Sequence, residues 1–192
     1  LSSKEMNKCI SELKKVKNEN LIICDFGVGL FEKNVLNYLN SSKIKKYLNV
    51  QTNSINLGFN LFTKYLKYDY LSLDKREWSL GLKKVNLDLN DIDNSVKNYK
   101  YLAITKGKDG SVFKSKKETY HAPVFVESAK DTTGSGDAFF VITSLLTMLN
   151  IDNILIPFIG NVYAGMHSQN IGNYKIVNKD ELLNNINSLI KY

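Results

Sequence analysis

Short apolar runs alternate along the chain with longer stretches in which apolar residues recur every three or four positions. The short runs are rich in Leu, Ile, Val and Tyr and predict strands, whereas the longer stretches predict helices. The expected strands are residues 21–24, 47–50, 70–73 and 101–104, and residues 110–114 and 118–121 form a hairpin about a Lys-Ser-Lys-Lys turn. The expected helices are residues 30–39, 58–66, a segment from about Lys75, 89–98, 135–149, 154–167 and 179–190.

This alternation predicts an α/β fold with three layers, in which helices cover both faces of a central, mostly parallel sheet. In such sheets ligands bind beyond the carboxyl ends of the strands. Polar residues follow the expected strands at or just past those ends, namely Asp25, Asn53, Asp74, Glu77 and Thr105. The pattern therefore predicts a ligand site along this edge of the sheet.

Size and composition favour one soluble globular domain, residues 1–192, with 43% hydrophobic and 23% charged residues. No run approaches the roughly 18 apolar residues that a membrane helix needs, and no secretory leader is visible. Cys9 and Cys24 lack metal-ligand spacing, which is typical of reduced thiols in a cytoplasmic protein. Because the first residue is Leu, we expect an amino-terminal portion upstream.

The net charge of +7 raises the question of a nucleic-acid partner. The lysines are spread along the chain in short clusters and are not gathered with aromatic residues in one patch. We therefore expect neither nucleic acid nor a membrane as partner, and interpret the charge as a basic rim that attracts an anionic small-molecule substrate. His121 and His167 are too far apart to form a local metal motif, and each is interpreted as an ordinary surface or half-buried residue.

The segment Asp-Thr-Thr-Gly-Ser-Gly-Asp at residues 131–137 carries the clearest chemistry. A glycine-rich turn that leads into a helix directs unpaired N–H groups and the positive end of the helix dipole at one point. That point suits a phosphoryl group in transfer, and Asp137 stands where it could accept a proton from an attacking hydroxyl. The alternative is a helix that Asp131 or Asp137 merely caps.

This segment resembles the signature Asp-Thr-x-Gly-Ala-Gly-Asp of the ribokinase-like (PfkB-type) carbohydrate kinases, with Ser135 in place of Ala. The resemblance extends from about residue 20 to residue 190 and corresponds to the carboxyl-terminal portion of a family member. It implies that Gly134, Ser135 and Gly136 form an anion hole and that Asp137 is the catalytic base. It further implies that Asp131 and Thr133 face a monovalent cation such as K⁺.

Two further segments resemble nucleotide-binding parts of the same family. Thr105, Gly107 and Gly110 match its Thr-x-Gly-x-x-Gly segment beside the phosphates and ribose of ATP, although the glycines could simply turn the chain into the hairpin. Asn161 lies in a helix of small residues that the resemblance places along the adenine. Tight helix packing would explain the same small residues.

The segment Asp-Lys-Arg-Glu at residues 74–77 resembles the family's Asn-x-x-Glu. The resemblance implies that Glu77 organises the water shell of Mg²⁺, a role that suits a hard oxygen ligand. Asp74 replaces the usual Asn. The alternative is a capped helix with an acidic first turn.

The acceptor-binding residues are predicted from two loops. Asp25-Phe-Gly-Val-Gly resembles the Asp-Tyr-Gly-Lys-Gly loop of heptose-7-phosphate kinases, with Val28 in place of Lys. The other loop supplies Gln51, Asn53 and Lys64, whose side chains could reach a sugar or a phosphate. A polar β-to-α loop would look similar without such a role.

Together these features predict ATP- and Mg²⁺-dependent phosphoryl transfer to a hydroxyl of a sugar or sugar phosphate, with a heptose phosphate as one acceptor. Ribose, fructose phosphate, a nucleoside or a vitamin stay open as alternatives. A nucleotide-binding regulatory module without catalysis is a further alternative. A homodimer is a candidate assembly.

Overall fold

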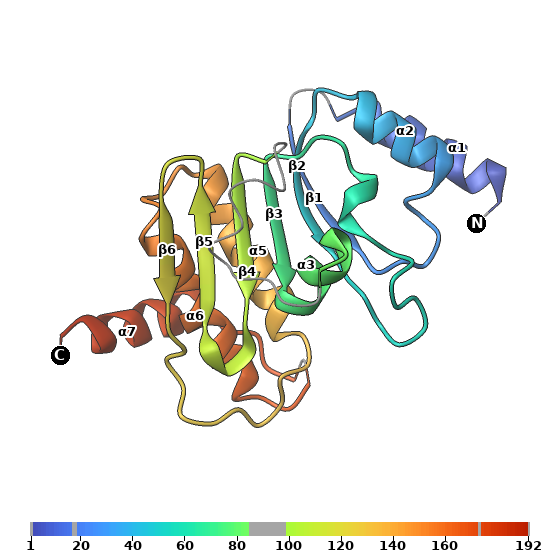
Figure 1. Cartoon of the computed structure of the whole chain (residues 1–192). Coiled ribbons are helices and arrows are strands. Elements are labelled where there is room, and N and C mark those ends of the chain that lie inside the picture. Colours follow the sequence, from blue (N-terminus) through green and yellow to red (C-terminus); the bar gives the residue numbers. More distant parts are fainter. Residues whose placement is uncertain (1, 17–18, 85–98, 173, 192) are drawn as a thin grey trace. The chain divides into compact units, whose positions relative to one another are not determined.

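The computed structural model describes residues 2–16, 19–84, 99–172 and 174–191 (Figure 1). The chain divides into two compact units, Leu1–Leu102 and Ala103–Tyr192. Six strands are hydrogen-bonded in the order β1-β2-β3-β4-β5-β6, and β4 (Tyr101–Thr105) crosses the boundary between the units. The predicted α/β fold with a mostly parallel sheet is confirmed.

The first unit alternates helices with parallel strands. Along the chain it contains α1 (Ser3–Leu13), β1 (Asn20–Asp25), α2 (Lys33–Ser41), β2 (Lys45–Val50), the 3₁₀ turn η1 (Phe62–Lys64), β3 (Tyr70–Asp74) and α3 (Lys75–Leu82). Strand β2 pairs in parallel with both β1 and β3, and α1 lies beside α2 (Figure 1). Its core includes the fully buried Trp78, whose ring stacks on Phe62 at 5.3 Å between centroids.

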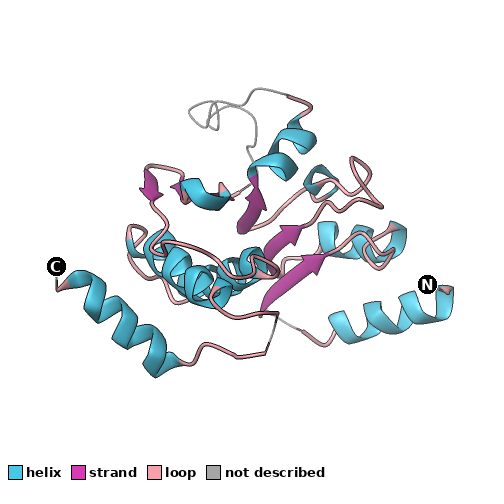
Figure 2. Ribbon diagram, turned by 90° about the horizontal axis from the view of Figure 1, so that it is seen from below, coloured by secondary structure: helices cyan, strands magenta, loops and turns pink. Residues whose placement is uncertain are grey.

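The second unit joins a hairpin to a pair of packed helices. After the 3₁₀ turn η3 (Gly107–Asp109) it contains β5 (Ser111–Ser115), β6 (Thr119–Ala122), α5 (Ser135–Met148), α6 (Leu155–Ser168) and α7 (Lys179–Ile190), the last helix before the carboxyl terminus (Figure 2). Strands β5 and β6 are antiparallel. Helices α5 and α6 pack at Gly160, where a Cβ atom would lie 2.6 Å from Phe139 and Thr143. Helix α5 can therefore approach α6 closely enough to bury Phe139 and Phe140.

Most predicted elements are confirmed within one to three residues at each end, but the predicted helix at residues 58–66 is wrong. Only residues Phe62–Lys64 form a single 3₁₀ turn there. Gly58 adopts a positive φ of 78°, and the side-chain amide of Asn60 donates to the carbonyls of Asp25 and Gln51, both at 3.0 Å. These tertiary bonds hold the segment as a loop. The predicted helix at 89–98 lies outside the described residues.

Helix α1 was not among the predicted elements. It begins with a capping box, in which the Glu5 amide donates to Ser2 Oγ at 3.3 Å and the Ser2 amide donates to Glu5 Oε2 at 2.8 Å. The spacing of Ser2 and Glu5 was the signal that could have revealed it. Within the residues that the structure describes, no helix has the length and apolar character needed to cross a membrane.

Candidate active site

The predicted phosphate-binding turn lies in the second unit and leads directly into α5. Gly134 is the N-cap of this helix with a φ of 77°, a left-handed conformation that glycine adopts without strain. The Ser135 amide donates to the Thr132 carbonyl at 3.1 Å, and the first helical bond joins the Ala138 amide to the Gly134 carbonyl at 2.9 Å. The turn is thus closed by its own backbone before the helix begins.

Two backbone amides of the turn differ from that of Ser135. Among the residues that the structure describes, the N–H groups of Gly134 and Gly136 have no acceptor. The Ser135 amide, which the resemblance also assigns to the anion hole, donates to Thr132. The structure therefore supplies two donors at the positive end of the α5 dipole, where an anion is stabilised.

Gly136 differs from Gly134 and Gly160 because neither its backbone conformation nor its neighbours require a glycine. It lies in the first turn of α5 without a left-handed φ, and a Cβ atom added there would meet no heavy atom within 4 Å. Glycine in a helix costs about 0.5–1 kcal/mol relative to alanine. The missing side chain thus leaves open space beside an amide for which the described part of the chain supplies no acceptor, as close approach of a ligand would require.

Asp137 is the acidic residue of the first turn of α5 and is half-buried. A carboxylate at this end of a helix is stabilised by the helix dipole. It follows Gly136 directly in sequence, so its carboxylate and the open amide belong to the same helical turn. This placement agrees with the predicted base without testing its chemistry.

Ser135 carries the departure from the family signature. Its Oγ is buried and has no hydrogen-bond partner among the described residues. A buried hydroxyl without a partner costs about 1–3 kcal/mol. The substitution of Ser for the usual Ala therefore costs stability here.

We expect Ser135→Ala to raise the free energy of unfolding by about 1 kcal/mol, because the variant no longer buries an unpaired hydroxyl. Urea unfolding measures the change. Ser144→Ala on the same helix is the matched control, since the buried Ser144 hydroxyl donates to the Phe140 carbonyl at 2.7 Å and its loss should lower stability. Equal destabilisation by both substitutions would contradict the prediction.

The segment before the turn is bound to the end of α6. The Asp131 carboxylate accepts hydrogen bonds from the Thr133 and Gly172 amides, both at 2.8 Å. The Thr133 amide, and after it the Gly172 amide, hold the pKa of Asp131 below its ordinary value. The amides of Lys130 and Asp131 both donate to the Ser168 carbonyl, at 2.9 and 3.1 Å. These bonds position the turn relative to α6.

His167 joins the same cluster, which sequence reasoning did not anticipate. Its Nε2 lies 3.2 Å from the carbonyl oxygen of Thr133. The contact links residues 34 positions apart, so no local pattern could have revealed it.

The predicted nucleotide-binding residues of the second unit differ in their surroundings. Thr105 is half-buried at the end of β4, and Gly107 has a φ of 57° with no heavy atom within 4 Å of an added Cβ. At Gly110 an added Cβ would lie 2.1 Å from the Ala122 carbonyl oxygen, so the hairpin itself requires this glycine. The Asn161 amide donates to the carbonyls of Ala122 and Pro123, both at 2.8 Å, and so holds the end of β6. Any contact of these residues with a nucleotide stays a prediction.

In the first unit, Asp74 and Glu77 form the capping box that was the alternative to a metal role. Asp74 Oδ1 accepts from the Glu77 amide at 2.6 Å, and Glu77 Oε2 accepts from the Asp74 amide at 2.9 Å. Glu77 Oε1 accepts from the Thr52 amide at 3.0 Å and thereby ties the loop after β2 to α3. The capped helix is confirmed, and a part in magnesium binding stays a prediction.

Asp25 and Lys64, both predicted to bind the acceptor, form an ion pair of 2.6 Å. The Asp25 side chain is 2% exposed and also accepts from the Tyr65 hydroxyl at 2.9 Å and the Gly27 amide at 3.0 Å. Burial and the neighbouring carboxylate raise the pKa of Tyr65, so its phenol stays protonated and donates. Asp25 thus holds a buried polar network at the end of β1.

Gln51 and Asn53 stand in the loop that this network supports. The Gln51 amide donates to the Asp25 carbonyl at 2.8 Å, and Asn53 Oδ1 accepts from the amides of Ile55 and Asn56 at 2.9 and 3.1 Å. The Asn53 side chain is therefore engaged in a local turn. The structure therefore brings Asp25 and Lys64 into side-chain contact, and it links Asp25 to Gln51 through a backbone hydrogen bond.

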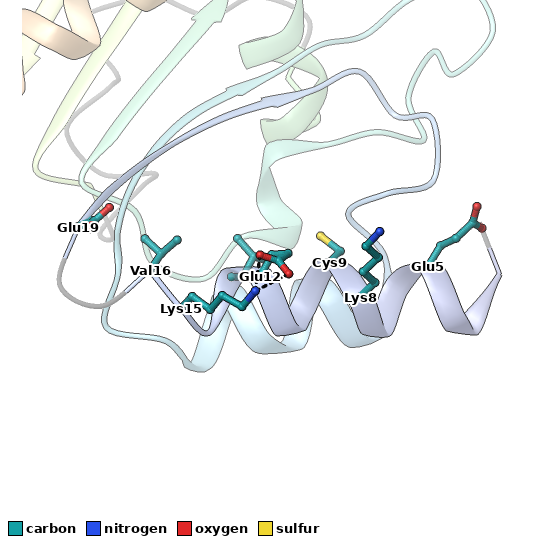
Figure 3. Close-up of a pocket in the computed structure, with 8 residues that line it drawn as sticks. Glu5, Lys8, Cys9, Glu12, Lys15, Val16 and Glu19 are labelled. Atoms are coloured by element: carbon teal, nitrogen blue, oxygen red, sulfur yellow. Dashed lines mark hydrogen bonds and ion pairs between the residues drawn. The ribbon is translucent and has the colours of Figure 1, made fainter.

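A separate pocket lies along α1 (Figure 3). Its lining combines the apolar residues Leu13 and Val16 with the exposed ion pair of Glu12 and Lys15 at 2.7 Å. It contains none of the residues predicted to bind or react with a ligand. We do not assign it to the active site.

Comparisons with solved structures show the same fold. Phosphofructokinase-2 of Escherichia coli in complex with potassium superposes with a TM-score of 0.79 and 13% identity, over 99% of this chain and 63% of that one. Ribokinase of Arabidopsis thaliana complexed with ribose and ATP gives 0.65 and 17%, over 79% and 50%. The nucleoside kinase of Methanocaldococcus jannaschii gives 0.56 and 19%, over 66% and 42%. The chain thus spans less than two thirds of each of these proteins.

No curated protein matches the chain significantly in sequence. The model of the pfkB family carbohydrate kinases matches residues 28–147. This range contains both the capping box at Asp74 and Glu77 and the turn that ends at Asp137. Since the match covers more than half of the sequence, the chain belongs to the pfkB family of carbohydrate kinases.

Proposed function

We propose that the chain carries the phosphoryl-transfer part of a kinase that moves the γ-phosphoryl group of ATP to a hydroxyl of a sugar or sugar phosphate. The observation that carries this proposal is Gly136, whose absent side chain leaves open space beside an amide that has no acceptor among the described residues. Family membership supplies the reaction class. The activity of the whole protein is part of the proposal.

The second unit accounts for the charge that develops during transfer. The acceptor oxygen forms a bond to the γ-phosphorus as the bond to the ADP oxygen breaks, and the hydroxyl proton passes to the Asp137 carboxylate. The amides of Gly134 and Gly136 would donate to the phosphoryl oxygens, with the α5 dipole adding to their effect. Thr105 and Gly107 would lie beside the remaining phosphates.

Magnesium, when bound, would neutralise charge on the phosphate oxygens. In the part of the chain that the structure describes, no group of three or more His, Cys, Asp or Glu side chains could hold a metal ion. Mg²⁺ sites formed chiefly by substrate phosphates and water need only one or two carboxylates. Glu77 and Asp74 fit such an outer role, since hard carboxylate oxygens are what the water shell of the ion requires.

The acceptor is a narrower question. The similar structures include a phosphofructokinase, a ribokinase and a nucleoside kinase. We treat fructose phosphate, ribose and nucleosides as candidate acceptors. The assignment of a heptose phosphate as acceptor rests only on the loop at residues 25–29, where Val28 replaces Lys. The comparisons add no support for this assignment. Asp25 and Lys64 pair with each other, so we assign them the support of the acceptor loop. The Asn53 side chain is also engaged in a local turn, and direct contact with the acceptor stays a proposal for Gln51 and Asn53.

ADP release from ATP and Mg²⁺, measured over a panel of sugars, sugar phosphates, nucleosides and vitamins, tests the proposal. We expect release that depends on one class of acceptor. ATP binding without turnover on any acceptor would favour the regulatory module. Light scattering on the same preparation tests the predicted homodimer.

Gly136→Ala separates a functional glycine from a structural one. We expect turnover to fall by about 100-fold, because the methyl group would displace the phosphoryl group from the open amide. The free energy of unfolding should stay level or rise by about 0.5–1 kcal/mol, since alanine favours the helix. Kinetic assays and urea unfolding on one preparation measure both changes.

Gly160→Ala is the control for this variant. Its Cβ would lie 2.6 Å from Phe139, so it should lower stability. If the turnover of Gly136→Ala stayed within about threefold of the original rate, the role that we propose for Gly136 would be contradicted.

A further inference from the structure

His167 occupies the last turn of α6 and reaches the phosphate-binding turn. Its Nε2 lies 3.2 Å from the Thr133 carbonyl oxygen, and a carbonyl oxygen only accepts hydrogen bonds, so the imidazole donates an N–H. Thr133 directly precedes Gly134, the N-cap of α5. The imidazole therefore holds the backbone at the residue from which the turn enters the catalytic helix.

The oxygens around this contact are already paired with donors. Asp131 Oδ1 accepts from the Thr133 amide and Oδ2 from the Gly172 amide, both at 2.8 Å. The Ser168 carbonyl accepts two amides, those of Lys130 and Asp131. Together with the Thr133 carbonyl, each of these oxygens has a donor from the chain itself.

The family resemblance implies a monovalent cation at Asp131 and Thr133, and the residues present do not fit one. Asp131 Oδ1 and Oδ2 each accept one N–H group and keep a further lone pair, so the conflict with a cation lies at the Thr133 carbonyl, which accepts the His167 N–H. The imidazole N–H also directs positive charge at the Thr133 carbonyl, so a cation on the same oxygen would be repelled. A cation is thus disfavoured at Thr133, one of the two residues that the resemblance assigns to it.

We propose that His167 takes the place of the monovalent cation, and that its N–H positions the Asp131–Asp137 turn without added K⁺. His167 is a positioning residue in this arrangement, because it acts through the Thr133 carbonyl and not on the substrate. Its effect on catalysis rests on the proposed kinase function. The expectation that K⁺ does not affect the stability of the folded chain is independent of the kinase function.

Thermal unfolding of the full chain in KCl and in choline chloride of equal ionic strength tests the proposal independently of turnover. We expect the original chain to melt within about 1 °C in both salts, and His167→Ala to melt lower in choline and to gain more than about 2 °C in KCl. His167→Gln, whose Nε2 can also donate, should behave as the original chain. His121→Ala is the control, since His121 is the other histidine of the chain and is exposed on β6.

Once the screen has identified an acceptor, turnover kinetics provide a second test. In choline chloride, kcat of His167→Ala should fall on the order of tenfold with little change in the KM for ATP, and KCl should restore it. A KCl-dependent rise in the melting temperature or in the turnover of the original chain would overturn the proposal, and so would a His167→Ala variant indifferent to K⁺. Failure to find any acceptor would count against the kinase function, and the melting comparison would still decide the role of His167.

Discussion

Asp137→Asn is expected to lower turnover by a factor of about 10²–10⁴ while ATP still binds, because the amide cannot accept the proton of the attacking hydroxyl. The side chain keeps its size and its place in the first turn of α5. The N–H groups that we propose to bind the phosphates are backbone groups and do not change. Initial rates of ADP formation, together with ATP titration calorimetry, measure the two effects separately.

Asp152→Asn is the matched control for this substitution. Asp152 is an exposed carboxylate of the same unit, whose Oδ1 accepts from the Ile154 amide at 3.3 Å just before α6. Its neutralisation should leave turnover within about twofold, because it lies outside the proposed site. Retention of the original rate in Asp137→Asn would remove this residue as the base, whatever the outcome for ATP binding.

Lys64→Met is expected to lower the free energy of unfolding by about 3 kcal/mol, because it leaves the buried Asp25 carboxylate without its cation. Asp25 is 2% exposed and lies 2.6 Å from Lys64 Nζ. The hydroxyl of Tyr65 and the amide of Gly27 still donate to the carboxylate and limit the loss. Urea unfolding followed by circular dichroism measures the change.

Two further variants assign that loss to the unpaired charge. Lys67→Met alters an exposed lysine of the same segment and should change stability by less than about 0.5 kcal/mol. Asp25→Asn combined with Lys64→Met should be more stable than Lys64→Met alone, since the double variant buries no unpaired charge. Additive losses in the double variant would show that the ion pair is not the source of the effect.

The glycine-rich turn that leads into α5 could be predicted because a turn and a helix start depend on neighbours in sequence. Gly134 adopts the positive φ that only glycine tolerates easily, and Asp137 follows it into the first turn of α5. The strands were predicted for a similar reason, since their apolar runs are continuous. At these places local preference and tertiary structure agree.

The helix predicted at residues 58–66 shows where such reasoning fails. Its apolar spacing suits a helix, but Asn60 donates to Asp25 and Gln51, which lie 35 and 9 positions earlier in the chain. Those bonds depend on the pairing of β1 with β2, which brings the ends of the two strands together. The spacing of apolar residues carries no information about them.

The sequence by itself determined the fold class, the family and the position of the glycine-rich turn before α5, because each depends on short-range patterns. Only the tertiary structure decided which side chains serve the fold and which are open to a ligand. It pairs Asp25 with Lys64, commits Asn161 to the end of β6, leaves Gly136 beside open space and brings His167 to Thr133. These partners are distant in the chain or depend on empty space, so packing alone brings them about.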